Sequence, residues 1–298
     1  MTLSWRGCPV RARIQVARVR SCAWRFGTLR YAERVFAGVP EGMVLDRKLF
    51  GHRIWLEVGR SSVQQLLALD GERFIAERAL VESLLSPGMT FVDVGANIGY
   101  YMLLAQRSVG KRGMIICIEP DEANLRELSR QIKGNDLTNV VVLPVAAGAE
   151  DREARLEPGI NARVRADGSG TGEVRLRRLD SLLDAPVDVL KIDVEGYEGH
   201  VLDGAAELLR RWRPALFLEV HPQLLDGPYS VESVLGVVLG LGGTIEVYTD
   251  ARPTSTLAKV KARYVRGRAV QRSELASLIR ACQSGQQRDP FWVVRRTS

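Results

Sequence analysis

The feature that most constrains the fold is the stretch FVDVGANIGYY at residues 91–101. Apart from one acid, its first four residues are apolar, as in a strand that is buried on both faces. Two glycines and an asparagine interrupt this pattern, and apolar residues then resume with the density of a helix. A strand, a tight glycine turn and a helix form the first half of a nucleotide-binding βαβ unit. The stretch therefore predicts an α/β fold.

The chain that follows alternates between short apolar runs and helical patterns, which is typical of parallel strands joined by crossover helices. We expect strands at Thr90–Val94, Met114–Ile118, Val140–Val145, Val187–Ile192, Ala215–Val220, Thr244–Thr249 and Phe291–Arg295. We expect helices at about 71–86, 98–108, 121–133, 198–211 and 230–240. This alternation predicts an open, mostly parallel sheet.

A chain of 298 residues, 46% of them hydrophobic, can bury a large core, and we expect one main domain with additions. The expected parts are a basic N-terminal segment at 1–32, a cap or helical region at 33–89 and a Rossmann-like domain at 90–298. Inside this domain we expect an inserted hairpin at about 153–179 and a basic insertion at about 251–289.

The net charge of +7 is distributed unevenly, because residues 1–30 hold seven arginines and no acid. A basic end attracts nucleic acid, an anionic membrane surface or a phosphorylated substrate, and a solvated tail is the simplest alternative. Apolar residues between the arginines leave an interfacial helix open, so peripheral membrane contact stays an alternative. We expect no nucleic-acid partner, and the oligomeric state stays open.

The four cysteines are scattered and form no CxxC pair, which favours free thiols in a reducing compartment over a zinc site. The sequence has no apolar run of about 18 residues or more, so we expect no transmembrane segment. Its first residues also lack the apolar core of a secretory signal. These features predict a cytoplasmic protein.

The glycine turn has the pattern GxNxG. Gly95, Asn97 and Gly99 are the fixed positions, and Ala96 and Ile98 lie between them. Asp93 lies two residues ahead of the first glycine, where it would repel a pyrophosphate. An ammonium group would instead bind a carboxylate there through charge-assisted hydrogen bonds. The turn therefore favours a ligand with an amino acid end.

The next two strand ends suggest the rest of that ligand. Glu119 and Pro120 follow the second strand, 20 residues beyond Gly99, where an acid usually accepts two ribose hydroxyls. A capping or surface glutamate is the alternative. Ala146, among small residues at 144–148, suits the wall of an adenine slot, although small residues also permit tight turns. Adenine, ribose and an amino acid end together describe S-adenosylmethionine (SAM), the expected cofactor.

Charged residues also follow the fourth and fifth strands, on the sheet edge where open α/β sheets bind ligands. Asp193, Glu195 and His221 are the catalytic candidates, with Glu219 beside them. A structural histidine is the alternative for His221. The carboxylates could supply oxygen ligands to magnesium, but no spacing requires this, so a divalent metal stays open and is not predicted.

With these residues, the chain resembles the FkbM family of SAM-dependent methyltransferases. The resemblance covers about residues 72–223 and rests on FVDVGANIGYY, IEPDEANLREL, NDLTNVVVLPVAAG, LRRLDSLL, VLKIDVEGYEGHVLDGA and LFLEVHP. It implies a Rossmann-like class I methyltransferase fold, with a seven-stranded, mostly parallel sheet and helices on both faces. It also implies O-methylation of a hydroxyl on a sugar, glycan or secondary metabolite, a small-molecule or glycan acceptor.

The resemblance implies roles for residues that match the family's motifs. Asp93 and the turn residues Gly95, Asn97 and Gly99 would hold the methionine end of SAM. Glu119 would hold the ribose and Ala146 the adenine, with Asp193, Glu195 and His221 around the transferred methyl group. Asp180 also matches, and its position in LRRLDSLL suggests a structural helix N-cap.

Three alternatives belong to other functional classes. A nucleic-acid methyltransferase would suit the basic ends, but Asp193 and Glu195 would repel phosphates. A nicotinamide oxidoreductase would need GxGxxG in place of GxNxG. A non-catalytic SAM-binding module would keep the fold without turnover.

Overall fold

The computed structural model describes residues 35–40, 42–70, 75–157, 163–164, 168–225, 227–249, 268–270, 274–287 and 290–296. The chain divides into two compact units. The smaller comprises Met1–Ile75, Ser129–Leu137 and Arg252–Val265, and the larger comprises Ala76–Leu128, Thr138–Ala251 and Arg266–Ser298. The predicted basic segment at 1–32 lies outside the described residues, as does much of the predicted insertion at 251–289. The predicted domain boundaries stay predictions.

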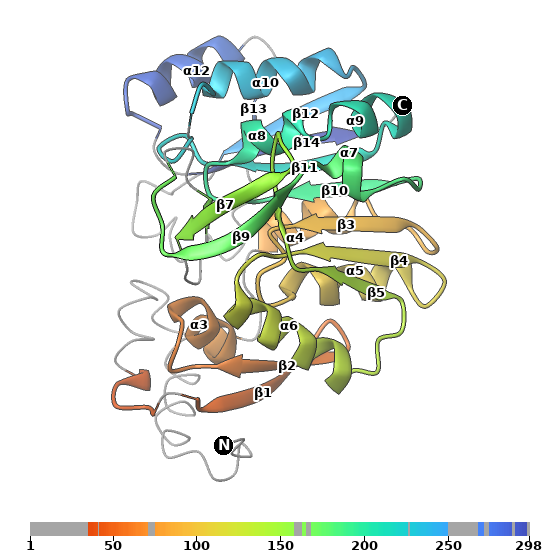
Figure 1. Ribbon diagram of the computed structural model, residues 1–298, viewed down its shortest axis with the longest axis vertical. Helices are drawn as coiled ribbons and strands as arrows, with labels where there is room; N and C mark the ends of the chain where they lie inside the picture. The colour runs from red at the N-terminus through yellow and green to blue at the C-terminus, as the bar shows by residue number, and fades with distance from the viewer. Residues whose placement is uncertain are drawn as a thin grey trace. The chain divides into compact units, whose positions relative to one another are not determined.

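A large sheet runs through the larger unit, with strand order β13-β12-β14-β11-β10-β3-β4-β5 (Figure 1). The strands are β3 (Thr90–Val94), β4 (Met114–Ile118), β5 (Val140–Leu143), β10 (Val189–Ile192), β11 (Ala215–Val220), β12 (Thr244–Thr249), β13 (Arg268–Val270) and β14 (Phe291–Arg296). Strands β11, β10, β3, β4 and β5 are parallel, and β14 is antiparallel to both β11 and β12. The predicted seven-stranded, mostly parallel sheet is confirmed, and β13 adds a short eighth strand at one edge.

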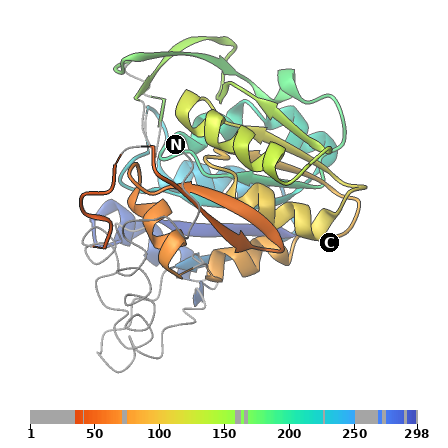
Figure 2. The ribbon, with the colours of Figure 1, turned by 90° about the horizontal axis from the view of Figure 1, so that it is seen from below.

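Helices cover both faces of this sheet (Figure 2). They are α4 (Ile75–Glu82), α5 (Tyr100–Val109), α6 (Glu122–Gly134), α7 (Leu179–Leu182), α8 (Glu198–Asp203), α9 (Ala206–Trp212), α10 (Val231–Gly240) and α12 (Leu275–Gln283). The chain moves from β3 to β4 in one direction and from β10 to β11 in the other. Right-handed crossovers therefore place α5 and α8 on opposite faces.

The predicted helix at 198–211 is instead two helices, α8 and α9. The break lies at Gly204, where a Cβ atom would come within 1.8 Å of the carbonyl oxygen of Gly148. The close approach therefore requires glycine at this position, where α8 ends.

Successive side chains along the parallel strands point to opposite faces of the sheet, and each face packs in its own buried layer. Val92, Leu190 and Leu216 belong to the hydrophobic core on the face covered by α8, α9 and α10. Lys191 and Phe217, the next residues along β10 and β11, consequently face the side covered by α5. Both sets are fully buried, which explains why these strands read as nearly continuous apolar runs.

A second, four-stranded sheet in the larger unit has the order β6-β9-β7-β8. Its strands are β6 (Ala146–Ala147), β7 (Arg152–Glu157), β8 (Arg163–Val164) and β9 (Gly172–Arg177). Along β7 and β9, exposed polar residues alternate with buried apolar ones, so only one face is covered. That face packs in a small core with Tyr197, the residue before α8.

The smaller unit contains an antiparallel hairpin of β1 (Val44–Leu49) and β2 (His52–Glu57), followed by α3 (Ser62–Asp70). Gln131, on the last turns of α6, accepts a hydrogen bond from the Trp55 backbone N–H at 2.9 Å and donates one to its carbonyl at 2.7 Å. Asn135 pairs in the same way with Arg53. Amide side chains one helical turn apart thus provide hydrogen-bond partners for the backbone N–H and C=O groups on the outer edge of β2. Among the described residues, no helix is both long and apolar enough to cross a bilayer.

Candidate functional site

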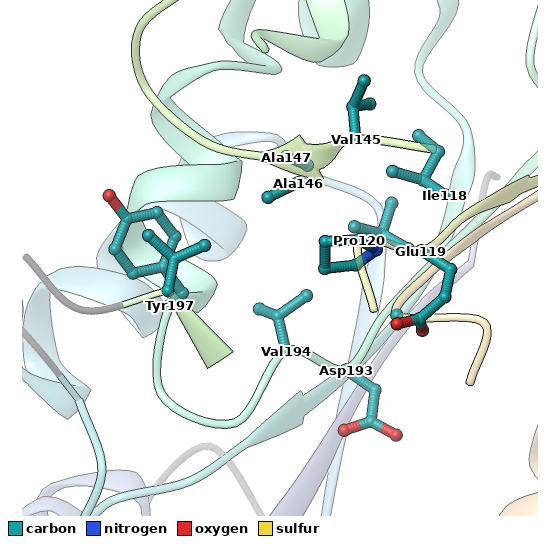
Figure 3. Close-up of a pocket in the computed structure, with 12 residues that line it drawn as sticks. Ile118, Glu119, Pro120, Val145, Ala146, Ala147, Asp193, Val194 and Tyr197 are labelled. Atoms are coloured by element: carbon teal, nitrogen blue, oxygen red, sulfur yellow. The ribbon is translucent and has the colours of Figure 1, made fainter. Parts of the chain in front are cut away.

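A pocket opens in the larger unit at the carboxyl ends of β3, β4 and β10 (Figure 3). It contains about 390 Å³ of space free of atoms, part of it open to solvent. Its lining residues are Val94, Gly95, Ile118, Glu119, Pro120, Val145, Ala146, Ala147, Val164, Asp193, Val194 and Tyr197. The carboxylates of Glu119 and Asp193 lie to one side, and Val145, Ala146 and Ala147 lie to another. The pocket thus combines an acidic wall with an apolar slot.

The glycine turn forms one rim of the pocket and has a left-handed backbone, with φ of +79° at Gly95, +50° at Asn97 and +90° at Gly99. A Cβ atom on Gly95 would lie 1.9 Å from the carbonyl oxygen of Asp193. The end of the neighbouring strand β10 therefore requires glycine at this position. The turn and the end of β10 are therefore in direct backbone contact.

Glu119 holds this turn to the end of β4. The Asn97 backbone N–H donates to Oε2 of Glu119 at 2.7 Å. Oε1 accepts from the Asp121 N–H at 2.9 Å and from the Asn124 amide at 3.2 Å. Burial raises the pKa of Glu119 to about 7, although these donors oppose the rise. A carboxylate has about four acceptor positions, so one stays available to a ligand hydroxyl.

Asp93 is wholly buried and does not line the pocket. Nζ of Lys191 donates to its Oδ1 at 2.9 Å, and its Oδ2 has no hydrogen bond among the described residues. Burial raises the pKa of Asp93, and the charge of Lys191 opposes the rise. The carboxylate is thus already paired with a cation of the chain. Its predicted contact with the amino end of SAM stays a prediction.

The ends of β10 and β11 bring several charged side chains together beside the pocket. Nε2 of His221 lies 3.5 Å from Oε2 of Glu195, 3.8 Å from Oε1 of Glu219 and 3.9 Å from Oδ1 of Asp193. On its other side, Nδ1 lies 2.7 Å from Oε1 of Glu198. Asp193 is the member of this cluster that also lines the pocket.

These carboxylates change the protonation of their neighbours. Burial by itself would lower the pKa of His221, but the hydrogen bond to Glu198 and the nearby acids raise it to about 10. Burial, followed by repulsion from Asp193, raises the pKa of Glu219 to about 8. Burial also raises the pKa of Glu195. At neutral pH the imidazole is therefore protonated, and it is not a free base in this geometry.

The predicted site residues fall into three positions. Gly95, Glu119, Pro120, Ala146 and Asp193 line the pocket. Ala96, Asn97 and Gly99 complete the glycine turn beside it, while Glu195 and His221 lie in the charged cluster. Asp93 lies beneath the turn in its pair with Lys191.

Two residues of the site were missed, Lys191 and Glu198. The signal for Lys191 is a charged residue inside the apolar run VLKI, because a charge on a strand buried on both faces needs a partner. Glu198 lies at the start of α8, where acids are common, so its bond to His221 has no signal in the sequence.

Residues 93–238 match a family model described as the methyltransferase FkbM domain. Among solved structures, the chain is similar to a methyltransferase FkbM from Methylobacillus flagellatus, with 20% identity, a TM-score of 0.41, and coverage of 62% of this chain and 50% of that one. A SAM-dependent O-methyltransferase from Thermotoga maritima shows 13% identity and a TM-score of 0.42, over 76% and 67% of the two chains.

A putative rRNA-methylase from Clostridium thermocellum shows 11% identity and a TM-score of 0.43, over 74% and 94% of the two chains. The match therefore spans half the length of the Methylobacillus chain and most of the Clostridium chain. No curated protein matches the sequence.

Proposed function

Residues 93–238 belong to the FkbM methyltransferase family, as the sequence motifs predict, and from this premise we propose that the chain transfers a methyl group from SAM to a hydroxyl. The proposed acceptor is a sugar, a glycan or a secondary metabolite. The observation that carries the proposal is a buried carboxylate, Glu119, beside a slot of small apolar residues in one pocket.

Each part of that pocket suits a part of SAM. Glu119 accepts a ribose hydroxyl at its remaining acceptor position, while Pro120 and Ala146 flank the adenine. The turn from Gly95 to Gly99 lies nearest the amino acid end. A sulfonium carries a positive charge, which the acidic side of the pocket at Asp193 stabilises.

Methyl transfer from a sulfonium is an in-line displacement, in which the acceptor oxygen forms a bond to the methyl carbon as the carbon–sulfur bond breaks. Positioning the hydroxyl supplies much of the acceleration, and a base that takes its proton supplies more. We assign the proton to Asp193, because it lines the pocket and His221 is already protonated. The protonated imidazole of His221, whose Nε2 lies 3.9 Å from Oδ1 of Asp193, holds that carboxylate in place.

The test uses the intact chain, SAM labelled in its methyl group, and an extract of small metabolites and glycans. We expect label in methyl ethers, which resist mild alkali. Asp193→Asn should lower the rate at saturating SAM at least about tenfold. This corresponds to an increase of about 1.4 kcal/mol in the activation free energy. Asp184→Asn, at an exposed position, is the matched control and should keep full activity.

Other outcomes would favour the alternatives. Label in nuclease-sensitive material would indicate a nucleic-acid methyltransferase. Binding of S-adenosylhomocysteine (SAH) without transfer to any component would favour a non-catalytic module.

A further inference from the structure

Asp193, Glu219 and His221 direct three possible metal-ligand atoms at one point beside the pocket. They follow two adjacent parallel strands, β10 and β11, at the same edge of the sheet. Their ligand atoms all lie within 4.8 Å of one another. From this arrangement we propose that the three side chains bind one divalent cation of the Mn²⁺ or Mg²⁺ class.

The dimensions of the cluster suit such an ion. With metal–ligand distances of about 2.1 Å, neighbouring ligands of an octahedral ion lie about 3.0 Å apart and opposite ligands about 4.2 Å apart. Nε2 of His221 is 3.8 Å from Glu219 and 3.9 Å from Asp193, between these values. Small side-chain rotations would therefore close the three atoms around a cation.

The setting of His221 is a separate reason to expect a ligand. The side chain is 93% buried, and its Nε2 faces the carboxylates of Glu195, Glu219 and Asp193 at distances of 3.5 to 3.9 Å. A cation between these groups would give Nε2 a shorter bond than any of the three contacts. On the other side of the ring, Nδ1 is held by Glu198, which is itself fixed by the Gly196 N–H at 3.0 Å. An outer carboxylate of this kind orients metal-bound histidines and leaves Nε2 to the metal. The cation would displace the proton that Nε2 carries in its absence, and this proton would go to solvent.

The charges in the cluster also favour a cation. Asp193, Glu195, Glu198 and Glu219 place four carboxylates around one imidazole. In the part of the chain that the structure describes, Lys191 lies 3.6 Å from Asp193 but closer, at 2.9 Å, to Asp93. Two carboxylates and one imidazole suit an ion that accepts oxygen and nitrogen ligands together.

The ion would leave coordination positions open toward the pocket, because Asp193 both belongs to the metal-ligand cluster and lines the pocket. Resting on the proposed function, we assign these positions to the acceptor hydroxyl, which the ion orients toward the donor methyl group. The two adjacent oxygens of a diol would occupy two of them. The binding of the ion itself depends only on the geometry of the cluster.

The experiment titrates Mn²⁺ into the full-length protein without SAM and follows free Mn²⁺ by electron paramagnetic resonance. We expect one bound ion per chain. Glu219→Gln and His221→Ala should each raise the Kd for Mn²⁺ at least about tenfold. Glu122→Gln, whose side chain is 92% exposed, is the matched control and should leave the Kd unchanged. Equal affinity in all four proteins would indicate only adventitious binding to surface acids and would overturn the proposal.

A second measurement keeps the proposal testable if either variant fails to fold. Electron spin echoes of Mn²⁺ bound to the wild type should show modulation from a coordinated imidazole nitrogen, and its absence overturns the proposal. SAH binding is measured on the same samples. Nitrogen-coupled Mn²⁺ without SAH binding would support the cation site while contradicting the proposed function, so the two failures give different results.

Discussion

Glu119 links three backbone segments at the mouth of the pocket. Its oxygens accept from the N–H groups of Asn97 and Asp121 and from the amide of Asn124, while the side chain stays 3% exposed. A substitution there would therefore affect the glycine turn as well as any ligand. The same burial makes this carboxyl group sensitive to pH near neutrality.

We expect Glu119 to lower the stability of the protein as the pH rises. Its pKa increases from 4.5 to about 7 on folding, because burial disfavours the charge. A group whose pKa is raised by folding makes its full contribution to stability at pH values below its pKa in the unfolded chain. This contribution is lost as the pH rises through the pKa of the group in the folded protein. The free energy of unfolding of the wild type, relative to Glu119→Gln, should fall by about 3 kcal/mol between pH 4.5 and 7.5.

Chemical denaturation at several pH values measures this difference. Glu122→Gln, at an exposed site on the same segment, is the control and should show almost no pH-dependent difference from the wild type. A flat difference for Glu119→Gln as well would show that folding does not raise the pKa of this carboxyl group.

At the scale of the elements, Asp180 connects two helices. The motif LRRLDSLL suggested a helix N-cap, but the residue caps α9 rather than its own helix α7, whose N-cap is Arg178. Oδ1 accepts from the Leu208 N–H at 2.8 Å and Oδ2 from the Glu207 N–H at 3.2 Å. These are two of the N–H groups that the first turn of a helix leaves without partners.

Removal of this cap should destabilise the protein without affecting the pocket. Asp180→Ala leaves both N–H groups of α9 without their acceptor, and we expect a loss of about 1–2 kcal/mol in the free energy of unfolding. The affinity for SAH should stay unchanged. Urea denaturation and calorimetry measure the two quantities, with Asp184→Ala as an exposed control that changes stability by less than about 0.5 kcal/mol. An equal effect of both variants would contradict the capping role.

At the scale of the whole molecule, all residues that line the pocket belong to the larger unit. Binding of SAH should therefore stabilise that unit against unfolding. At a free concentration of 100 times its Kd, a ligand that binds only the folded state adds about 2.7 kcal/mol. Thermal unfolding should show a higher Tm with SAH and no change with NAD⁺. A shift with NAD⁺ alone would favour the nicotinamide alternative.

Much of the fold could be predicted from local patterns. The predicted limits of β3, β4, β11 and β12 agree with the observed ones, because each is a short segment of strand-forming residues bounded by turn residues. The glycine turn was also recognisable, since left-handed backbone at Gly95 and Gly99 favours glycine. The need for glycine at Gly204, between α8 and α9, was not recognisable, because it depends on the carbonyl of Gly148, which is far away in the chain.

The sequence by itself therefore determined the order of the strands and helices, the α/β class and the position of the glycine turn. These properties depend on side-chain periodicity and backbone conformation, which are local. Only the tertiary structure decided which charged groups pair. Lys191 bonds Asp93 across 98 positions, and Glu198 bonds His221 across 23. Such partners depend on which strands become neighbours and which face each side chain takes, and no local pattern contains that information.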